Sequence, residues 1–105
     1  MLKTSNLKKS HTIRSFPVQG KVKIFPVDNP WIYVSVPKKF TEETKHLADR
    51  GLVAITAKFG KSIWNTSLMP MGDGTQFIPL PAKVRKSEEI ELGDHIRLSF
   101  TLRKR

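Results

Sequence analysis

HIRLSFTL, residues 95–102, is the stretch of this chain that most clearly decides its fold. Its polar positions are separated by the apolar residues Ile96, Leu98, Phe100 and Leu102. Successive side chains of a β-strand point to opposite faces, so this alternation predicts a strand with one buried face. The Gly93-Asp94 pair before it predicts the turn that opens the strand.

Five earlier segments also have the composition of strands. Alternating or β-branched apolar residues fill the segments 16–24, 31–36, 52–59, 62–69 and 75–80. Prolines and glycines lie between them, at 26–30 and 70–74, and predict turns. Gly60-Lys61 separates two of the strands by two residues, which predicts a hairpin.

Two segments are predicted to be helical. Residues 41–51 begin with Thr41, a residue type that caps helix N-termini, carry acids in the first turn and bases later, and end at Gly51. Residues 82–89 are expected to form one or two further helical turns. The chain is thus predicted to be all-β, or mainly β, with one or two short helices.

The chain also resembles itself when it is shifted by about 44 positions, which indicates an internal repeat. Tyr33-Val34 then falls on Phe77-Ile78, and Ile24 falls on Leu68. The two pseudo-repeats cover about residues 18–59 and 62–102. One such unit cannot bury both faces of its hairpins alone, so we expect the two to interlock into a single-chain, double-split β-barrel without exposed edges. A monomer is the expected state.

Length and composition bound the class of protein. The 105 residues suffice for one modest core, and 38% are hydrophobic, so one folded domain is expected. The absence of cysteine excludes disulfides, thiolate nucleophiles, iron–sulfur clusters and cysteine-ligated zinc. No apolar run follows the basic start or reaches membrane-spanning length, so we expect a cytoplasmic protein without membrane association.

Most of the net charge of +10 lies at the two ends of the chain. Residues 1–14 hold four Lys or Arg residues and no acid, and residues 103–105 are all basic, so the ends supply +7 of the total. We therefore divide the chain into a basic tail at 1–14, a barrel domain at 15–102 and a basic end at 103–105. Basic tails attract nucleic acid through phosphate contacts without reading its sequence, and they also occur as ordinary solvated termini.

No arrangement of side chains predicts catalysis. The three histidines have no ligand-type neighbours in sequence, and no metal motif or phosphate-binding loop is present. Thr66 and Ser67 have hydroxyls but no base that can be named as a partner. Asp73 lies between two glycines, where a carboxylate usually holds a turn. We expect no cofactor, no metal and no catalytic residue.

The two tryptophans allow two interpretations. Large aromatic side chains close the interior of small barrels, which favours burial of Trp31 and Trp64. An exposed tryptophan beside Arg85 and Lys86 would instead stack on a base or on another planar ligand. Core packing is the expectation for both side chains.

Several spaced motifs together resemble one family. They include the segment 31–37, Thr66-Ser67-Leu68, Gly72-Asp73-Gly74, Arg85-Lys86 and Gly93-Asp94. Over about residues 16–102 they resemble the bacterial and archaeal family called domain of unknown function 1905. The resemblance implies a double-split β-barrel in a prokaryotic protein, and it implies no activity.

Two segments depart from the pattern of this family. Residues 59–62 lack the Asn-Gly that is usual in this hairpin, and residues 87–90 are more acidic than the usual Ala-Leu-Gly-Ile. These departures leave the register of the hairpin open.

A second resemblance is confined to residues 80–94. This segment is similar to the swapped-hairpin DNA-binding modules of AbrB-type transition regulators and MazE-type antitoxins. In those modules two copies, one from each chain, present basic residues to DNA. The equivalent segment here, 36–43, has Lys38 and Lys39 but carries acids where Arg85-Lys86 stands in the other copy. Half of the expected positive surface is therefore missing.

These observations predict a small barrel that binds a small ligand or a protein partner and has no catalytic activity. The strand and two turns that carry the family-like residues define its candidate ligand site: Trp64, Thr66, Ser67, Asp73, Lys83, Arg85 and Lys86. The alternative is a nucleic-acid-binding protein that uses the basic tails together with Arg85 and Lys86.

Overall fold

The alternation in residues 95–102 forms strand β8 (His95–Leu102) in the computed structural model, which describes residues 14–28 and 30–104. The side chains of Ile96, Leu98 and Phe100 are buried, while His95 and Arg97 between them are exposed. The predicted strand is confirmed at both of its ends.

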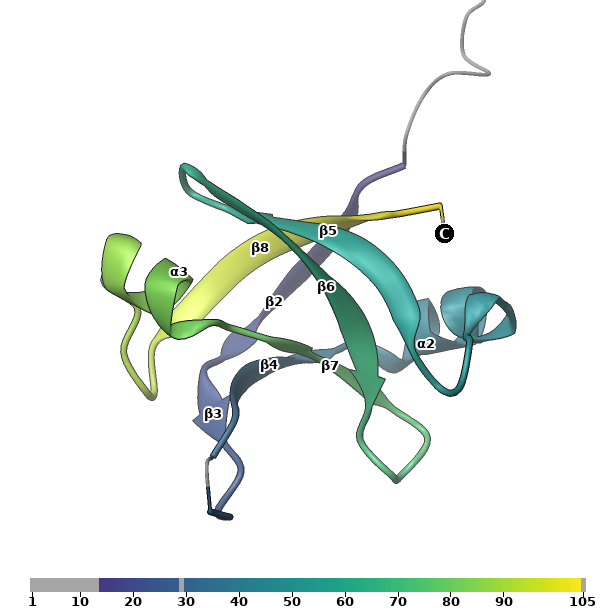
Figure 1. Cartoon of the computed structure of the whole chain (residues 1–105), viewed down its shortest axis with the longest axis horizontal. Coiled ribbons are helices and arrows are strands. Elements are labelled where there is room, and N and C mark those ends of the chain that lie inside the picture. Colours follow the sequence, from purple (N-terminus) through teal and green to yellow (C-terminus); the bar gives the residue numbers. More distant parts are fainter. Residues whose placement is uncertain (1–13, 29, 105) are drawn as a thin grey trace, which may run out of the picture.

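Six more strands join β8 in one antiparallel sheet (Figure 1). They are β2 (Phe16–Lys21), β3 (Lys23–Ile24), β4 (Ile32–Val36), β5 (Val53–Phe59), β6 (Ser62–Pro70) and β7 (Gln76–Pro79). The order across the sheet is β2-β8-β5-β6-β7-β4-β3. The outermost strands, β2 and β3, are consecutive pieces of the same chain, so the sheet closes on itself into a barrel. The predicted all-β barrel is confirmed.

A single residue, Val22, joins the two ends of the sheet. Its N–H donates to the carbonyl of Asp94 at 2.8 Å, and its carbonyl accepts from the N–H of Gly93 at 2.9 Å. Its side chain is 1% exposed. At this point the chain stops pairing with β8 and begins to pair with β4.

Apolar side chains from both repeats and both helices fill the barrel. The rings of Phe16 and Phe100 stack at 4.7 Å between centroids, and Phe40 packs its edge on Phe16 at 5.1 Å. The most deeply buried large side chains include Phe100, Ile55, Leu68, Ile78, Val18, Val22, Val34 and Val53. Since side chains occupy the interior, ligands must bind on the outer faces or at the ends of the barrel.

The strand pairing also confirms two interlocked repeats. The first contributes β2, β3, β4 and β5, and the second contributes β6, β7 and β8, with one helix in each. The strands β4 and β7, which are equivalent, pair with each other, and so do β5 and β8. One detail of the predicted alignment is wrong: Leu68 pairs with Val53 and Gly20 pairs with Ile96, so Leu68 corresponds to Gly20 and not to Ile24. The extra residues of the first repeat lie at the bend around Val22.

The predicted helix at 41–51 is wrong at both ends. The structure has α2 (Lys38–Thr44) followed by a single 3₁₀ turn, η2 (Lys45–Leu47), and Thr41 lies buried inside the helix instead of capping it. The helix begins early, after Pro37, because Phe40 packs against the phenylalanines of the core. The helical geometry ends at Ala48, which is extended, and Arg50, with a positive φ of 56°, lies in the turn before β5.

The second helix, α3 (Ala82–Ser87), is shorter than predicted and lies on the side of the barrel opposite α2 (Figure 1). It ends before Glu89, whose φ is 54°. None of the helices in the described residues is long and apolar enough to cross a membrane.

The hairpin between β5 and β6 has the predicted two-residue turn. Phe59 pairs with Ser62, which settles its register, and Gly60 has a positive φ of 59°. The carboxylate of Glu88, which follows α3, accepts hydrogen bonds from the N–H of Lys61 at 3.2 Å and from the hydroxyl of Ser62 at 2.6 Å. A Cβ at position 60 would overlap that carboxylate.

The structure describes only part of each of the two basic ends of the chain. Of the predicted tail at 1–14, residues 1–13 lie outside the described residues, while Arg14 pairs with Glu43. At the other end Arg103 binds the sheet: its N–H donates to the carbonyl of Ala54 at 3.0 Å. Its guanidinium donates to the carbonyls of Ile55 at 2.8 Å and Thr66 at 3.0 Å. Arg103 therefore holds β5 and β6 together.

Replacing Gly60 by Ala should lower the free energy of unfolding by about 2 kcal/mol, because an L-residue at this φ is strained. Urea denaturation measures this change. In a Glu88→Ala background the same replacement should cost less, since the overlap with the carboxylate is removed. An equal cost in the two backgrounds would show that Glu88 does not contact the turn.

Replacing Arg103 by Lys should destabilise the barrel by about 1 kcal/mol, since an ammonium keeps the charge but cannot reach both carbonyls with the geometry of a guanidinium. The urea midpoint reports the loss. Lys104→Gln, which removes a charge from the next residue, is the control and should leave the midpoint unchanged. Unchanged stability of Arg103→Lys would mean that charge alone matters at the end of β8.

Candidate functional site

Two of the predicted site residues, Trp64 and Arg85, meet at the end of β7. The indole N–H of Trp64 donates to the carbonyl of Pro79 at 3.3 Å, and Nε of Arg85 donates to the carbonyl of Leu80 at 2.9 Å. Trp64 comes from β6 and Arg85 from α3. The short segment 79–80 is thus held from two sides.

The other five predicted residues are placed elsewhere. Thr66 lies on the same face of β6 as the buried Leu68, whereas Ser67 lies on the opposite face, beside Ala54. Lys83 and Lys86 are exposed on α3. Of the seven predicted residues, the structure therefore brings Trp64 and Arg85 together. The hydroxyls of β6 and the lysines of α3 do not join them in one site.

Asp73 holds the turn before β7, at the end of that strand opposite Pro79. Its carboxylate accepts the hydroxyl of Thr75 at 2.5 Å and the N–H of Thr75 at 3.0 Å. The hydrogen bond from the Thr75 hydroxyl, followed by the one from the Thr75 N–H, holds the pKa of the Asp73 carboxyl below its ordinary value. The residue acts as the turn-forming carboxylate that its position between two glycines suggests.

The expectation that both tryptophans fill the core is wrong for Trp31. Its side chain is 44% exposed, while that of Trp64 is half-buried and packs against the core. The reason is parity: Val34 and Val36 face the interior of β4, so Trp31 falls on the outward side of the strand with Tyr33. The alternation of residues 31–36 contains this information.

An aromatic cluster on the outer face holds Trp31 in place. Its ring packs edge-on against Phe77 at 6.0 Å, and Phe77 in turn contacts Tyr33 and Phe25, each at 5.0 Å. Phe25 and Tyr33 stack on each other at 4.6 Å. Trp31 is the exposed end of this cluster.

Trp31 and Arg85 line one shallow hollow of about 360 Å³. The start of β4 and the end of β7 form its floor, and three prolines contribute to its walls: Pro30, Pro79 and Pro81. Within residues 14–28 and 30–104, the guanidinium of Arg85 makes one hydrogen bond, through Nε, so its terminal nitrogens are available to a ligand. This hollow pairs an exposed indole with a fixed cation.

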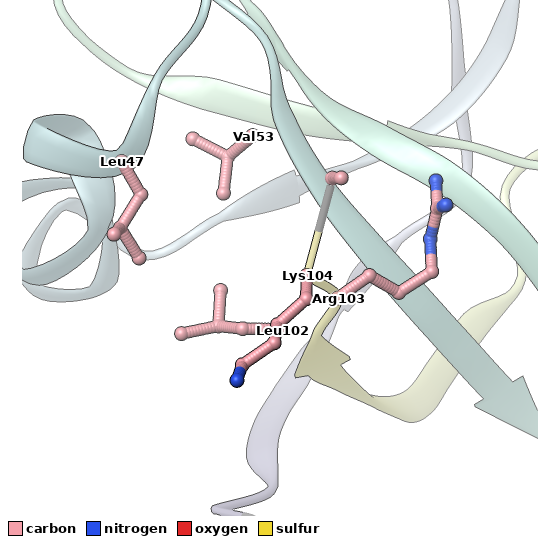
Figure 2. A pocket seen from close by; sticks show the side chains of 6 residues that line it. Leu47, Val53, Leu102, Arg103 and Lys104 are labelled. Atoms are coloured by element: carbon pink, nitrogen blue, oxygen red, sulfur yellow. The ribbon is translucent and has the colours of Figure 1, made fainter.

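A second hollow, of about 310 Å³, lies beside η2 and the end of β8. Figure 2 shows the side chains of Leu47, Val53 and Leu102 pointing toward one another, whereas the guanidinium of Arg103 extends away from them. That guanidinium is engaged by carbonyls of the sheet. The hollow is therefore apolar and offers few groups that could orient a ligand.

Two further hollows lie beside β2, one toward the start of α2 and one toward the end of β5. One, of about 390 Å³, is lined by Pro17, Lys39 and Arg97 among others, and its neighbour, of about 340 Å³, by Pro17, Lys58 and Arg97. The described residues contain no group of three or more His, Cys, Asp or Glu side chains that could hold a metal ion. His46 lies on η2 and His95 on β8, while His11 is outside the described residues.

Comparison with known proteins adds one match. A family model described as a domain of unknown function (DUF1905) matches residues 12–100, which is most of the chain. No curated protein matches it.

The two tryptophans should differ in solution as they do in the structure. In Trp64→Phe the remaining Trp31 should emit at longer wavelength and be quenched several-fold more strongly by acrylamide than Trp64 is in Trp31→Phe, because Trp31 is the more exposed ring. Steady-state fluorescence of the two variants measures this. Equal quenching constants would contradict the outward position of Trp31.

Proposed function

The chain belongs to the domain of unknown function (DUF1905) family, and within it we propose that this protein is a binding module without catalytic activity, whose ligand occupies the hollow between Trp31 and Arg85. The ligand is a planar, negatively charged small molecule. The proposal rests on one observation: an exposed indole and a guanidinium with unoccupied terminal nitrogens line the same hollow.

The chemistry of the two side chains selects this class of ligand. The face of an indole stacks on planar π-systems, and a guanidinium forms paired, charge-assisted hydrogen bonds to a carboxylate or phosphate. Pro30, Pro79 and Pro81 add apolar surface between them. A molecule that is planar at one end and anionic at the other would engage both groups.

Several contacts fix the hollow before a ligand arrives. The N–H of Leu80 donates to the carbonyl of Ile32 at 2.8 Å, so the two strand ends that form the floor are tied together. Arg85 is anchored at Leu80 and Trp31 is held against Phe77. Binding to preorganised groups costs less conformational entropy, which favours affinity for a small ligand.

The lining favours binding over catalysis. The described residues around the hollow are proline, tryptophan, isoleucine, leucine and arginine, which supply no carboxylate, imidazole or nucleophilic hydroxyl. We also propose that the module acts as a monomer in the cytoplasm. Both repeats of the barrel come from one chain, and a chain without cysteine suits a reducing compartment.

The test uses Trp64→Phe, in which Trp31 is the single fluorescent tryptophan. Aromatic carboxylates and purine monophosphates should quench Trp31 saturably, and their uncharged counterparts, aromatic amides and nucleosides, should bind about tenfold more weakly because they lack the anion. Adding Arg85→Gln should remove this preference for the anion.

Lys83→Gln is the matched control, because it removes one positive charge from α3 at a residue that does not line the hollow. It should leave the quenching curves unchanged. If no planar anion quenches Trp31, or if Arg85→Gln and Lys83→Gln behave alike, the proposed site is wrong.

A further inference from the structure

Acidic and basic residues are distributed unequally over the barrel. All nine Asp and Glu residues lie on helices, turns and loops, and none lies on a named strand: they are Asp28, Glu42, Glu43, Asp49, Asp73, Glu88, Glu89, Glu91 and Asp94. Among the strands, β2, β3, β5 and β8 carry the cations Lys21, Lys23, Lys58 and Arg97. The sheet surface is therefore positive without local compensation.

Three of these cations fall on one diagonal of the outer sheet face. On β8, Arg97 stands opposite Gln19, His95 stands opposite Lys21, and Ser99 stands opposite Lys58. Measured along β8, Lys21 therefore lies at the level of residue 95 and Lys58 at the level of residue 99, with Arg97 midway between them. The three cations form a diagonal that crosses β2, β8 and β5. Diagonal neighbours of this kind lie about 7–8 Å apart. All three side chains are exposed and point away from the core.

The cations are not paired with acids. The ion pairs within the described residues are Arg14–Glu43 and Lys45–Glu42. Nε of Arg97 donates to the side-chain oxygen of Gln19 at 3.2 Å, which orients the guanidinium along the sheet. The diagonal therefore presents three positive charges to solvent.

Apolar surface lies between and beside these charges. The hollows of about 390 and 340 Å³ both include Pro17 and Arg97 in their lining. Pro17 lies on the outward side of β2, between the inward-facing Phe16 and Val18. Ile63, the neighbour of Lys58 on β6, is 65% exposed.

We propose that this outer face of β2, β8 and β5 binds a single strand of nucleic acid. Successive phosphates contact Lys21, Arg97 and Lys58, and unstacked bases lie over the apolar side chains of Pro17 and Ile63. Single-strand sites combine a line of cations along the backbone with apolar or aromatic surface for the bases, and a shallow face that is one cation wide suits one strand better than a duplex. The surface is separate from the Trp31–Arg85 hollow, and neither proposal depends on the other.

The test measures fluorescence anisotropy of a labelled mixed-sequence single-stranded DNA with the full chain, at roughly 20 to 200 mM salt. The wild type should bind with an affinity that falls steeply with salt. In Lys58→Gln with Arg97→Gln, the affinity should fall about tenfold, and the slope of log affinity against log salt should decrease by about 1.4, the value for two lost phosphate contacts on a single strand.

Lys83→Gln with Lys86→Gln is the matched control, because it removes the same charge from α3. It should reduce binding little. Equal losses in the two double variants would overturn the proposal, since net charge or the chain ends would then explain the binding. Unfolding midpoints of both variants establish that the barrel remains intact.

Three other outcomes would also overturn it. The first is that the wild type binds no DNA at the lowest salt. The second is that Trp31→Ala with Arg85→Gln abolishes binding while Lys58→Gln with Arg97→Gln retains it. The third is that the chain binds vesicles of phosphatidylserine but not DNA. The second outcome would move the nucleic acid to the other hollow, and the third would make the cationic face a membrane-contact surface.

Discussion

Closure of the sheet at Val22 is the constraint on which the rest of the barrel depends. The backbone hydrogen bonds of Val22 to Gly93 and Asp94 hold the chain where it turns from β8 to β4. Before the bend the chain pairs with β8, and after it the chain pairs with β4. One continuous stretch therefore serves both ends of the sheet, and the two repeats share a single core. The bend also divides the outer surface, since β2 leads toward β8 and β5 whereas β3 leads toward β4 and β7.

The two departures from the family-like pattern meet in space. The hairpin at 59–62 lacks Asn-Gly, and the segment 87–90 carries additional acids. Glu88 of the second segment accepts hydrogen bonds from Lys61 and Ser62 of the first. A turn that begins with glycine and has no Asn side chain of its own thus receives a carboxylate from a residue far away in sequence. One departure compensates for the other, and together they fasten the end of α3 to the hairpin.

Period-two alternation predicted the strands well because burial on one face acts residue by residue along β8 and β5. It did not predict the start of α2, which depends on the contact of Phe40 with Phe16 and Phe100, residues distant in sequence. The candidate site also depends on contacts between residues that are distant in sequence. Arg85 was identified from its local motif, but its pairing with Trp31 requires the ends of β4 and β7 to lie side by side. The alignment of Lys21, Arg97 and Lys58 requires the register of three strands, which composition does not contain.

The packed interior is the reason that both proposed binding surfaces lie on the outside of the barrel. Inward positions of each strand are occupied by the core, so outward positions remain available for function. On the β3, β4 and β7 side these positions hold an aromatic cluster that ends in the exposed Trp31. On the β2, β8 and β5 side most of them are polar or basic, and none is a carboxylate. The first surface suits a planar group and the second suits a row of phosphates, because stacking requires an aromatic face and phosphate binding requires cations without competing acids. One barrel therefore carries two surfaces of different chemistry, separated by the bend at Val22.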